Sequence, residues 1–243
     1  MNCSTITEMN SPNLWVGIPE FQRYTVNPSL FFYPSDKTTI VWRINAGIEN
    51  RLGGNMDYIK ENTSSGYFEK NKSERLSSQL SIDHDFGEHS HFNVKHSVSY
   101  FNRQLSSPGY VFEGRQLNSF TEASYSRRGE MAEWVAGMNV WNENFEERPY
   151  SNFPLRNFQQ NTVGAFVQNT FKAKEWLHIE SGVRGDYVNN YGFAFLPRVA
   201  VLFKPSASFS SRIGGGMGYK APTIFTEESE RLQYRNVLPI DAS

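Results

Sequence analysis

Apolar and polar side chains alternate with a period of two residues along most of the chain. In the stretch TTIVWRINAGIENR, Ile40, Trp42 and Ile44 fall on one face, and Arg43 and Asn45 fall on the other. The same alternation appears in RLSSQLSIDHDF, HFNVKHSVSYFN and WLHIESGVRGDY. A period of two is that of a β-strand whose two faces meet different surroundings.

The alternation predicts about ten strands, with ends uncertain by about two to four residues. They lie near residues 21–33, 38–52, 74–86, 91–105, 116–128, 133–147, 158–172, 176–189, 193–204 and 208–221. Many have about 12 to 15 residues, whereas soluble strands have about 5 to 6 and a tilted membrane-spanning strand needs about 9 to 11. Strand length therefore favours a membrane protein.

The connections between the predicted strands alternate between short and long. PSDK, GEHS, GEMA, AKE and PSAS are short and rich in turn-forming residues. Between them come GGNMDYIKENTSSGYFEKNKS, SSPGYVFEGR and ERPYSNFPLRN, with a brief NYG as the exception. Short turns at one end and longer loops at the other are typical of outer-membrane barrels. We therefore expect an all-β fold, an antiparallel up-and-down transmembrane β-barrel of which this chain supplies an incomplete set of strands.

Aromatic side chains gather near the short turns, where an interfacial girdle of a barrel would lie. They are Phe31, Phe32, Tyr33, Phe86, Trp134, Phe171, Trp176, Phe203 and Phe209. The general preference of aromatic residues for strands explains this clustering equally well.

Composition adds limits to this picture. Hydrophobic residues make up 38% of the 243 residues, and the mean hydropathy of −0.56 resembles that of a soluble protein. A barrel has the same appearance, because only every second residue faces lipid. A net charge of −1 gives no reason to expect nucleic acid as a partner. Cys3 is the single cysteine, which excludes an internal disulfide or a cysteine-based metal site.

Glycines interrupt the last predicted strand at Gly214, Gly215, Gly216 and Gly218. Glycine weakens an ordinary strand, so another requirement must favour it here. We expect the glycines on the polar face to leave space in a wide, wet lumen. A phosphate-binding loop is disfavoured, because no Gly-Lys-Ser/Thr follows.

The stretch from Asn161 to Thr223 resembles the barrel of a TonB-dependent outer-membrane receptor. It contains in order Phe-Val-Gln, Arg-Gly-Asp-Tyr, Leu-Pro-Arg-Val, Lys-Pro-Ser and Gly-Tyr-Lys-Ala-Pro-Thr. Residues 27–54 are similar to an earlier hairpin of the same family. The resemblance implies import of a scarce nutrient, such as a metal chelate, haem or a corrinoid, across the outer membrane of a Gram-negative bacterium, powered by a TonB-type energy transducer.

The sequence departs from that family in what it contains. We find no plug domain, no motif for contacting the transducer, no signal peptide and no terminal aromatic strand. We therefore expect a leading segment in residues 1–20 and part of a barrel in residues 21–243. Such a piece of a receptor would contact outer-membrane lipid and a small-molecule nutrient, but it would not transport alone.

Charged residues on the polar face are expected to line the lumen. They are Arg43, Glu49, Lys95, Arg184, Asp186, Arg198, Arg212 and Lys220. Aromatic and Arg residues in the long loops are better candidates for ligand contact, because such residues are typical contact anchors. They are Tyr110, Phe112, Arg115, Tyr150, Phe153 and Phe225.

Neither catalysis nor metal binding is expected. His178, Glu180, Arg184 and Asp186 form a polar stripe without a nucleophile or an oxyanion donor, which favours a lumen wall. His84, His89, His91 and His96 surround one turn, but they divide between two faces, so a polar turn is the better interpretation. We expect no catalytic residue, no cofactor and no metal ion.

Two other functions stay open. A small passive channel would require these strands to close into a barrel by themselves. A soluble carbohydrate-binding or adhesive β-sandwich would have shorter strands in two sheets.

Overall fold

The computed structural model describes residues 20–55, 58–59, 66–150 and 154–240. Cys3, Phe153 and the leading segment 1–19 lie outside the described residues.

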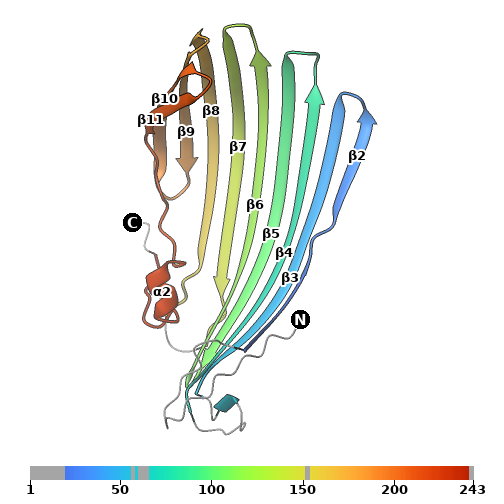
Figure 1. Ribbon diagram of the computed structural model, residues 1–243. Helices are drawn as coiled ribbons and strands as arrows, with labels where there is room; N and C mark the ends of the chain where they lie inside the picture. The colour runs from blue at the N-terminus through green and yellow to red at the C-terminus, as the bar shows by residue number, and fades with distance from the viewer. Residues whose placement is uncertain (1–19, 56–57, 60–65, 151–153, 241–243) are drawn as a thin grey trace.

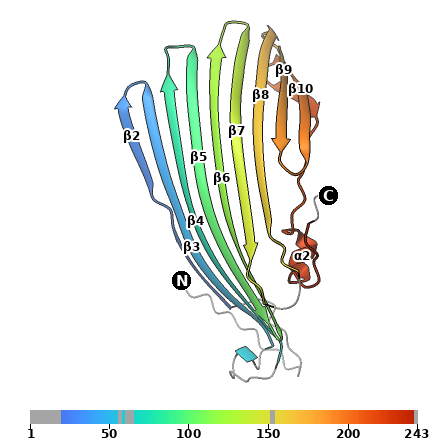
Figure 2. The ribbon, with the colours of Figure 1, turned by 180° about the vertical axis from the view of Figure 1, so that it is seen from behind.

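The described chain forms one curved antiparallel sheet of eleven strands (Figures 1 and 2). The strands are β1 (Glu20–Val26), β2 (Ser29–Ser35), β3 (Thr38–Gly54), β4 (Phe68–Asp85), β5 (Ser90–Ser107), β6 (Tyr110–Arg128), β7 (Ala132–Glu147), β8 (Phe158–Lys174), β9 (Leu177–Val188), β10 (Gly192–Ser206) and β11 (Phe209–Gly216). From β3 to β11 each strand pairs with its neighbours in the sequence. This order is that of an up-and-down barrel wall, and the sandwich alternative is wrong because all the strands share one sheet.

One predicted strand, residues 21–33, appears as β1 and β2. Both pair with β3 in one continuous register, since Val26 lies opposite Ala46 and Ser29 lies opposite Arg43. The break falls at Pro28, whose carbonyl accepts a bond of 3.1 Å from the amide of Ile44. Proline has no N–H to donate in return, so the ladder loses one bond there. This break accounts for eleven strands where we expected ten.

The predicted long connection SSPGYVFEGR is wrong. Only Pro108 and Gly109 lie between β5 and β6, and the pairs Ser107–Tyr110 and Ser106–Val111 continue the ladder up to the turn. Gly109 has a φ of +71°, a conformation that glycine adopts without strain. Pro-Gly here makes a tight hairpin instead of opening a loop.

β11 ends earlier than the predicted residue 221. Its last pair is Arg198 with Gly216, and the next amide, that of Met217, still donates to the carbonyl of Pro197 at 2.9 Å. Pro197 lacks the N–H that would return this bond, so the ladder stops. The chain then leaves the sheet, and the Tyr219 hydroxyl reaches Asp186 on the concave face.

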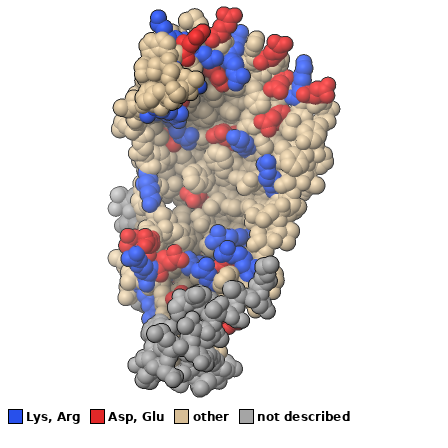
Figure 3. Space-filling view, viewed as in Figure 1, with Lys and Arg blue, Asp and Glu red and all other residues tan. Residues whose placement is uncertain are grey.

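The two faces of the sheet differ in the way that the alternation predicts. Apolar side chains stand exposed on the convex face, and they include Trp42, Ile48, Leu76, Val98, Leu117, Met138, Val163, Val183, Val199 and Ile213. The nine aromatic residues near the short turns are exposed as well. The hollow of the concave face carries Lys, Arg, Asp and Glu side chains (Figure 3).

After β11 the chain contains one short helix, α2 (Glu227–Arg231). The hydroxyl of Thr226 accepts a bond from the amide of Ser229 and so caps its first turn. Within the described part of the chain, no helix has both the length and the apolar composition needed to cross a bilayer.

Contact with the neighbouring strand, and not the need for space in the lumen, explains Gly214 and Gly216. A Cβ on Gly214 would lie 2.8 Å from the Cβ of Ala200 and 2.9 Å from the carbonyl oxygen of Val199. A Cβ on Gly216 would lie 3.0 Å from the carbonyl oxygen of Pro197. A Cβ on Gly215 or Gly218 would meet nothing within 4 Å. Close approach of β10 is therefore what requires glycine at the first two positions.

Gly214→Ala should reduce the unfolding free energy by about 1 to 3 kcal/mol, because the added methyl group is overpacked against backbone. Gly215→Ala is the matched control and should be neutral or slightly stabilising. Denaturant unfolding of the intact protein in detergent, followed by tryptophan fluorescence, measures both. Equal midpoints for the two variants would contradict the close-approach argument.

Candidate functional site

Residues 217–240, here called the covering segment, cross the concave face after β11. The segment descends from β11 to α2 along that face (Figure 1). The Tyr219 hydroxyl donates to Asp186 Oδ2 over β9 at 3.2 Å. Further along, Phe225 and Tyr234 contact side chains of β6 and β7. The covering segment thus lies on the face that a barrel would turn inward.

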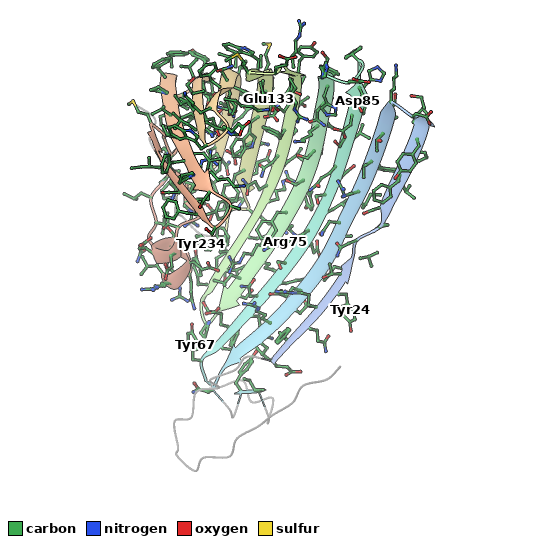
Figure 4. The ribbon with its side chains drawn as sticks, turned by 45° about the horizontal axis from the view of Figure 1, so that its top comes forward. Tyr24, Tyr67, Arg75, Asp85, Glu133 and Tyr234 are labelled. Atoms are coloured by element: carbon green, nitrogen blue, oxygen red, sulfur yellow. The ribbon has the colours of Figure 1, made fainter. Side chains whose placement is uncertain are left out.

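An apolar floor lies under the covering segment. Leu105 of β5, Phe112 of β6 and Phe145 of β7 are buried there with Ile224 and Tyr234. The rings of Phe112 and Tyr234 stack with centroids 4.3 Å apart, and Phe225 meets Phe145 edge-on at 5.1 Å. Figure 4 shows Tyr234 beside the strands of this floor. Aromatic contacts of this kind stabilise beyond the area that they bury.

A buried ion pair fastens the segment to the wall. Arg156, between β7 and β8, donates from Nε to Glu147 Oε2 at 2.8 Å, and its Nη1 donates to the carbonyl of Tyr234. Only 5% of Arg156 is exposed. Burial is the largest single influence and lowers the pKa of Arg156, but the hydrogen bonds and charges of Glu147 and Tyr110 together raise that pKa above its ordinary value. Burial also raises the pKa of the Tyr234 phenol, which therefore stays neutral.

Beside α2 a cavity of about 290 Å³ opens on the concave face. Four arginines from four strands line it, together with two glutamates. The arginines are Arg23 (β1), Arg51 (β3), Arg75 (β4) and Arg103 (β5), and the acids are Glu49 and Glu230. The lining also includes the polar residues Thr25, Asn45, Asn71 and Ser73 and the aromatic residue Phe101. We call this space the arginine cavity.

The charges of the arginine cavity are unequally paired. Glu49 forms ion pairs with both Arg23 and Arg51, the latter at 2.6 Å. Arg103 contacts Glu230 of α2 at 2.7 Å. The guanidinium of Arg75 lies 4.6 Å from the centre of the Phe101 ring and has no acidic partner among the described residues. Arg75 projects from the middle of β4 (Figure 4).

A second polar cluster occupies the wall of β7 to β9. Arg184 Nε donates to Asp186 Oδ2 at 2.9 Å, and its Nη2 donates to Asn139 Oδ1 at 3.1 Å. Asp186 and Asn139 are buried. A Cβ on Gly164 would lie 2.2 Å from Asp186 Oδ1, so the carboxylate fits only because residue 164 has no side chain.

A third cluster lies nearer the short turns. The carboxylate of Glu180 on β9 pairs with Arg198 of β10 and with Arg212 of β11, the latter at 2.7 Å. Both guanidinium groups are more than half exposed, so each pair contributes about 0 to 1 kcal/mol. The three residues tie adjacent strands together on the concave face.

The family profile described as TonB dependent receptor-like, beta-barrel, matches residues 14–229. The chain belongs to the TonB-dependent receptor family. This is a family of transporters and receptors and not of enzymes. Among proteins of curated function none matches the sequence.

Solved structures of outer-membrane receptors share the fold of this receptor chain. A ferric enterobactin receptor mutant from Pseudomonas aeruginosa matches with a TM-score of 0.68 at 11% identity, over 89% of this chain and 36% of its own. The alcaligin outer-membrane receptor from Bordetella pertussis matches with a TM-score of 0.66 at 12% identity, over 79% and 34%. A copper transporter matches with a TM-score of 0.64 at 13% identity, over 82% and 38%. The chain thus spans about a third of the length of these proteins.

The strand register of the receptor chain fixes the face of every predicted lumen residue that lies within a strand. Glu49 lies opposite Ser73, Ser73 lies opposite Arg103, and Arg103 contacts the covering segment. By the same alternation seven of the eight predicted residues project from the concave face: Arg43, Glu49, Lys95, Arg184, Asp186, Arg198 and Arg212. Lys220 lies beyond the end of β11, where the alternation no longer assigns a face.

The predicted ligand contacts that the structure describes, except Arg115, lie near the apolar floor in the receptor structure. Tyr110, Phe112 and Arg115 were expected in a loop, but they lie in β6. Arg115 pairs with Glu146 of β7 on the convex face, and Phe112 is 1% exposed in the apolar floor. Tyr150 is exposed beside Tyr110, and Phe225 belongs to the covering segment. Phe112, Tyr110 and Phe225 thus meet at the apolar floor with Tyr150 beside them, whereas Arg115 lies on the opposite face.

Sequence reasoning missed other residues that the receptor brings together. Arg75 and Arg103 follow the alternating pattern, so their face was predictable, but their common position depends on the register of four strands. Glu230 and Tyr234 reach the site through a segment without periodicity. No pattern in the sequence indicates their position.

The histidines divide between the faces as the alternation predicts. His91 on the concave side contacts Asp85 at 2.8 Å and Asp83 at 3.2 Å, whereas His84 contacts Thr38 at 2.9 Å. Within the described ranges, no group of three or more His, Cys, Asp or Glu residues has an arrangement that would hold a metal ion.

Arg156→Ala should loosen the covering segment of the receptor, because it leaves Glu147 buried without its partner. We expect a loss of about 3 kcal/mol in the local opening free energy. Hydrogen exchange of the amides in residues 229–236 measures this loss. Arg148→Ala is the control, because the Arg148 side chain is 74% exposed and lies 3.4 Å from Glu113. Equal exchange rates in the two variants would contradict a fastening role for Arg156.

Proposed function

We propose that this chain forms part of the barrel wall of an energy-coupled receptor in the outer membrane of a Gram-negative bacterium. The receptor imports a scarce nutrient past the concave face. A TonB-type energy transducer drives this import through a separate plug domain. Lipid of the outer membrane covers the convex face.

One observation carries this proposal: the separation of the two faces across ten consecutive strand positions. Exposed apolar side chains cover the convex face, and the charged clusters and the arginine cavity lie on the concave face. Lipid on one side and a polar lumen on the other require this arrangement. Backbone groups exposed to lipid cost several kcal/mol each, and long paired strands avoid that cost.

The nutrient class is the finer part of the proposal. The similar structures are named for alcaligin, copper and ferric enterobactin, and one belongs to a peptide importer. Those names describe those proteins. For this receptor we propose a metal chelate, haem or a corrinoid, because the concave face offers both aromatic and cationic contacts to a polar small molecule.

A passive channel is the less favoured alternative. In the described residues, β11 pairs only with β10, and β1 and β2 pair only with β3, so both edges of the sheet are open. A channel of these strands alone would have to join those edges. Membership of a receptor family favours a larger barrel.

Uptake in source cells tests the proposed function. With the gene deleted, we expect growth on one limiting nutrient among ferric chelates, haem and corrinoids to fail, and restoration by the intact gene. A protonophore, which removes the energy supply, should abolish that uptake. Uptake that persists at full rate in the presence of the protonophore would favour a passive channel.

Val98→Arg should impair assembly, because Val98 is exposed on the convex face near the middle of β5. An arginine facing the bilayer midplane costs about 2 to 4 kcal/mol. Ser97→Arg places the same charge on the adjacent concave position and should assemble normally. The yield of heat-modifiable protein in the outer-membrane fraction measures both variants. Equal yields would show that the convex face does not meet lipid.

A further inference from the structure

The arginine cavity has more positive charge than its acids balance. Its lining contains four guanidinium groups and two carboxylates, and Glu49 serves both Arg23 and Arg51. Arg75 faces the cavity without an acidic partner among the described residues. An excess of guanidinium charge in a concave space attracts oxyanions, because low-dielectric walls concentrate the field.

The cavity offers an oxyanion suitable hydrogen-bond donors as well as positive charge. A guanidinium presents N–H donors in a planar fork that matches carboxylate and phosphate oxygens. Asn71 and Ser73 add polar groups to the lining, and Asn71 Oδ1 accepts from Arg103 Nε at 3.3 Å, which orients that guanidinium. The cavity volume of about 290 Å³ is at the lower end of the range for small-molecule sites.

Glu230 shows where one oxyanion fits. Its carboxylate contacts Arg103 Nη2 at 2.7 Å, although it belongs to a five-residue helix and its side chain is 57% exposed. The Arg103 side chain is 15% exposed, so the less exposed partner belongs to the wall and the more exposed partner to the covering segment. An exposed carboxylate on a short helix is easily replaced by a ligand that offers the same group.

We propose that the arginine cavity binds a ligand bearing at least two carboxylate or phosphate groups. One oxyanion group pairs with Arg75, and another takes the place of Glu230 on Arg103. Binding therefore separates α2 from the wall at this contact. This inference rests on the proposed function, because it names the chemistry of the nutrient that the concave face receives.

Titration of the intact receptor in detergent with citrate and, separately, with pyrophosphate tests the proposal. We expect saturable binding of at least one probe, and the tighter of the two identifies carboxylate or phosphate as the preferred group. Arg75→Gln should weaken that binding about tenfold, as expected for loss of one charge-assisted pair. Glu230→Gln should tighten it, because the competing carboxylate is gone.

Arg43→Gln is the matched control. Arg43 projects from the same concave face and has no acidic partner among the described residues, but it does not line the cavity. Its substitution should leave the affinity unchanged. No saturable binding of either probe, equal loss in the Arg75 and Arg43 variants, or unchanged affinity in Glu230→Gln would each overturn the proposal.

The uptake and binding experiments can contradict the two proposals independently of each other. If energised uptake of a nutrient is found but the Arg75 and Arg43 variants bind the probes equally, the receptor function is supported and the oxyanion site is contradicted. If the probes bind as predicted but no energy-dependent uptake is found, the oxyanion site is supported and the receptor function is contradicted.

Discussion

The hydrogen-bond ladder from β3 to β11 is the constraint on which the rest of the structure depends. From β4 to β10 each strand satisfies its backbone groups with its two neighbours in the sequence, so no second layer is needed to bury them. A single layer has two faces, and the period of two gives each residue to one of them. The exposed apolar surface and the charged concave surface both follow from this one arrangement.

The sequence predicts this arrangement well because the relevant information is local. The alternation in residues 38–52 places Ile44 and Arg43 on opposite faces, and the register of β3 with β4 confirms it. Strand positions from β3 to β10 are likewise predicted to within a few residues, except where β4 and β6 begin earlier. The alternating pattern does not predict where β2 begins or where β11 ends, because a single proline sets each of these boundaries. Pro28 divides one strand, and Pro197 ends another from the neighbouring strand.

The candidate site was less predictable because it depends on contacts between distant parts of the chain. The arginine cavity combines Arg23, Arg75, Arg103 and Glu230 from four separate elements. Their meeting requires both the register of the sheet and the path of the covering segment. Phe112 illustrates the difficulty: an aromatic residue three positions after Pro-Gly is typical of an exposed loop, but the hairpin places it under Tyr234.

Because β11 ends early, the edge of the sheet at β11 is shorter than the neighbouring part of the wall. β11 has eight residues where its neighbour β10 has fifteen, so the sheet is lower at this edge than beside it. The chain leaves the wall at that low point and reaches the interior directly, without passing over the ends of taller strands. Pro197 on the adjacent strand thereby determines where the covering segment leaves the wall and enters the lumen.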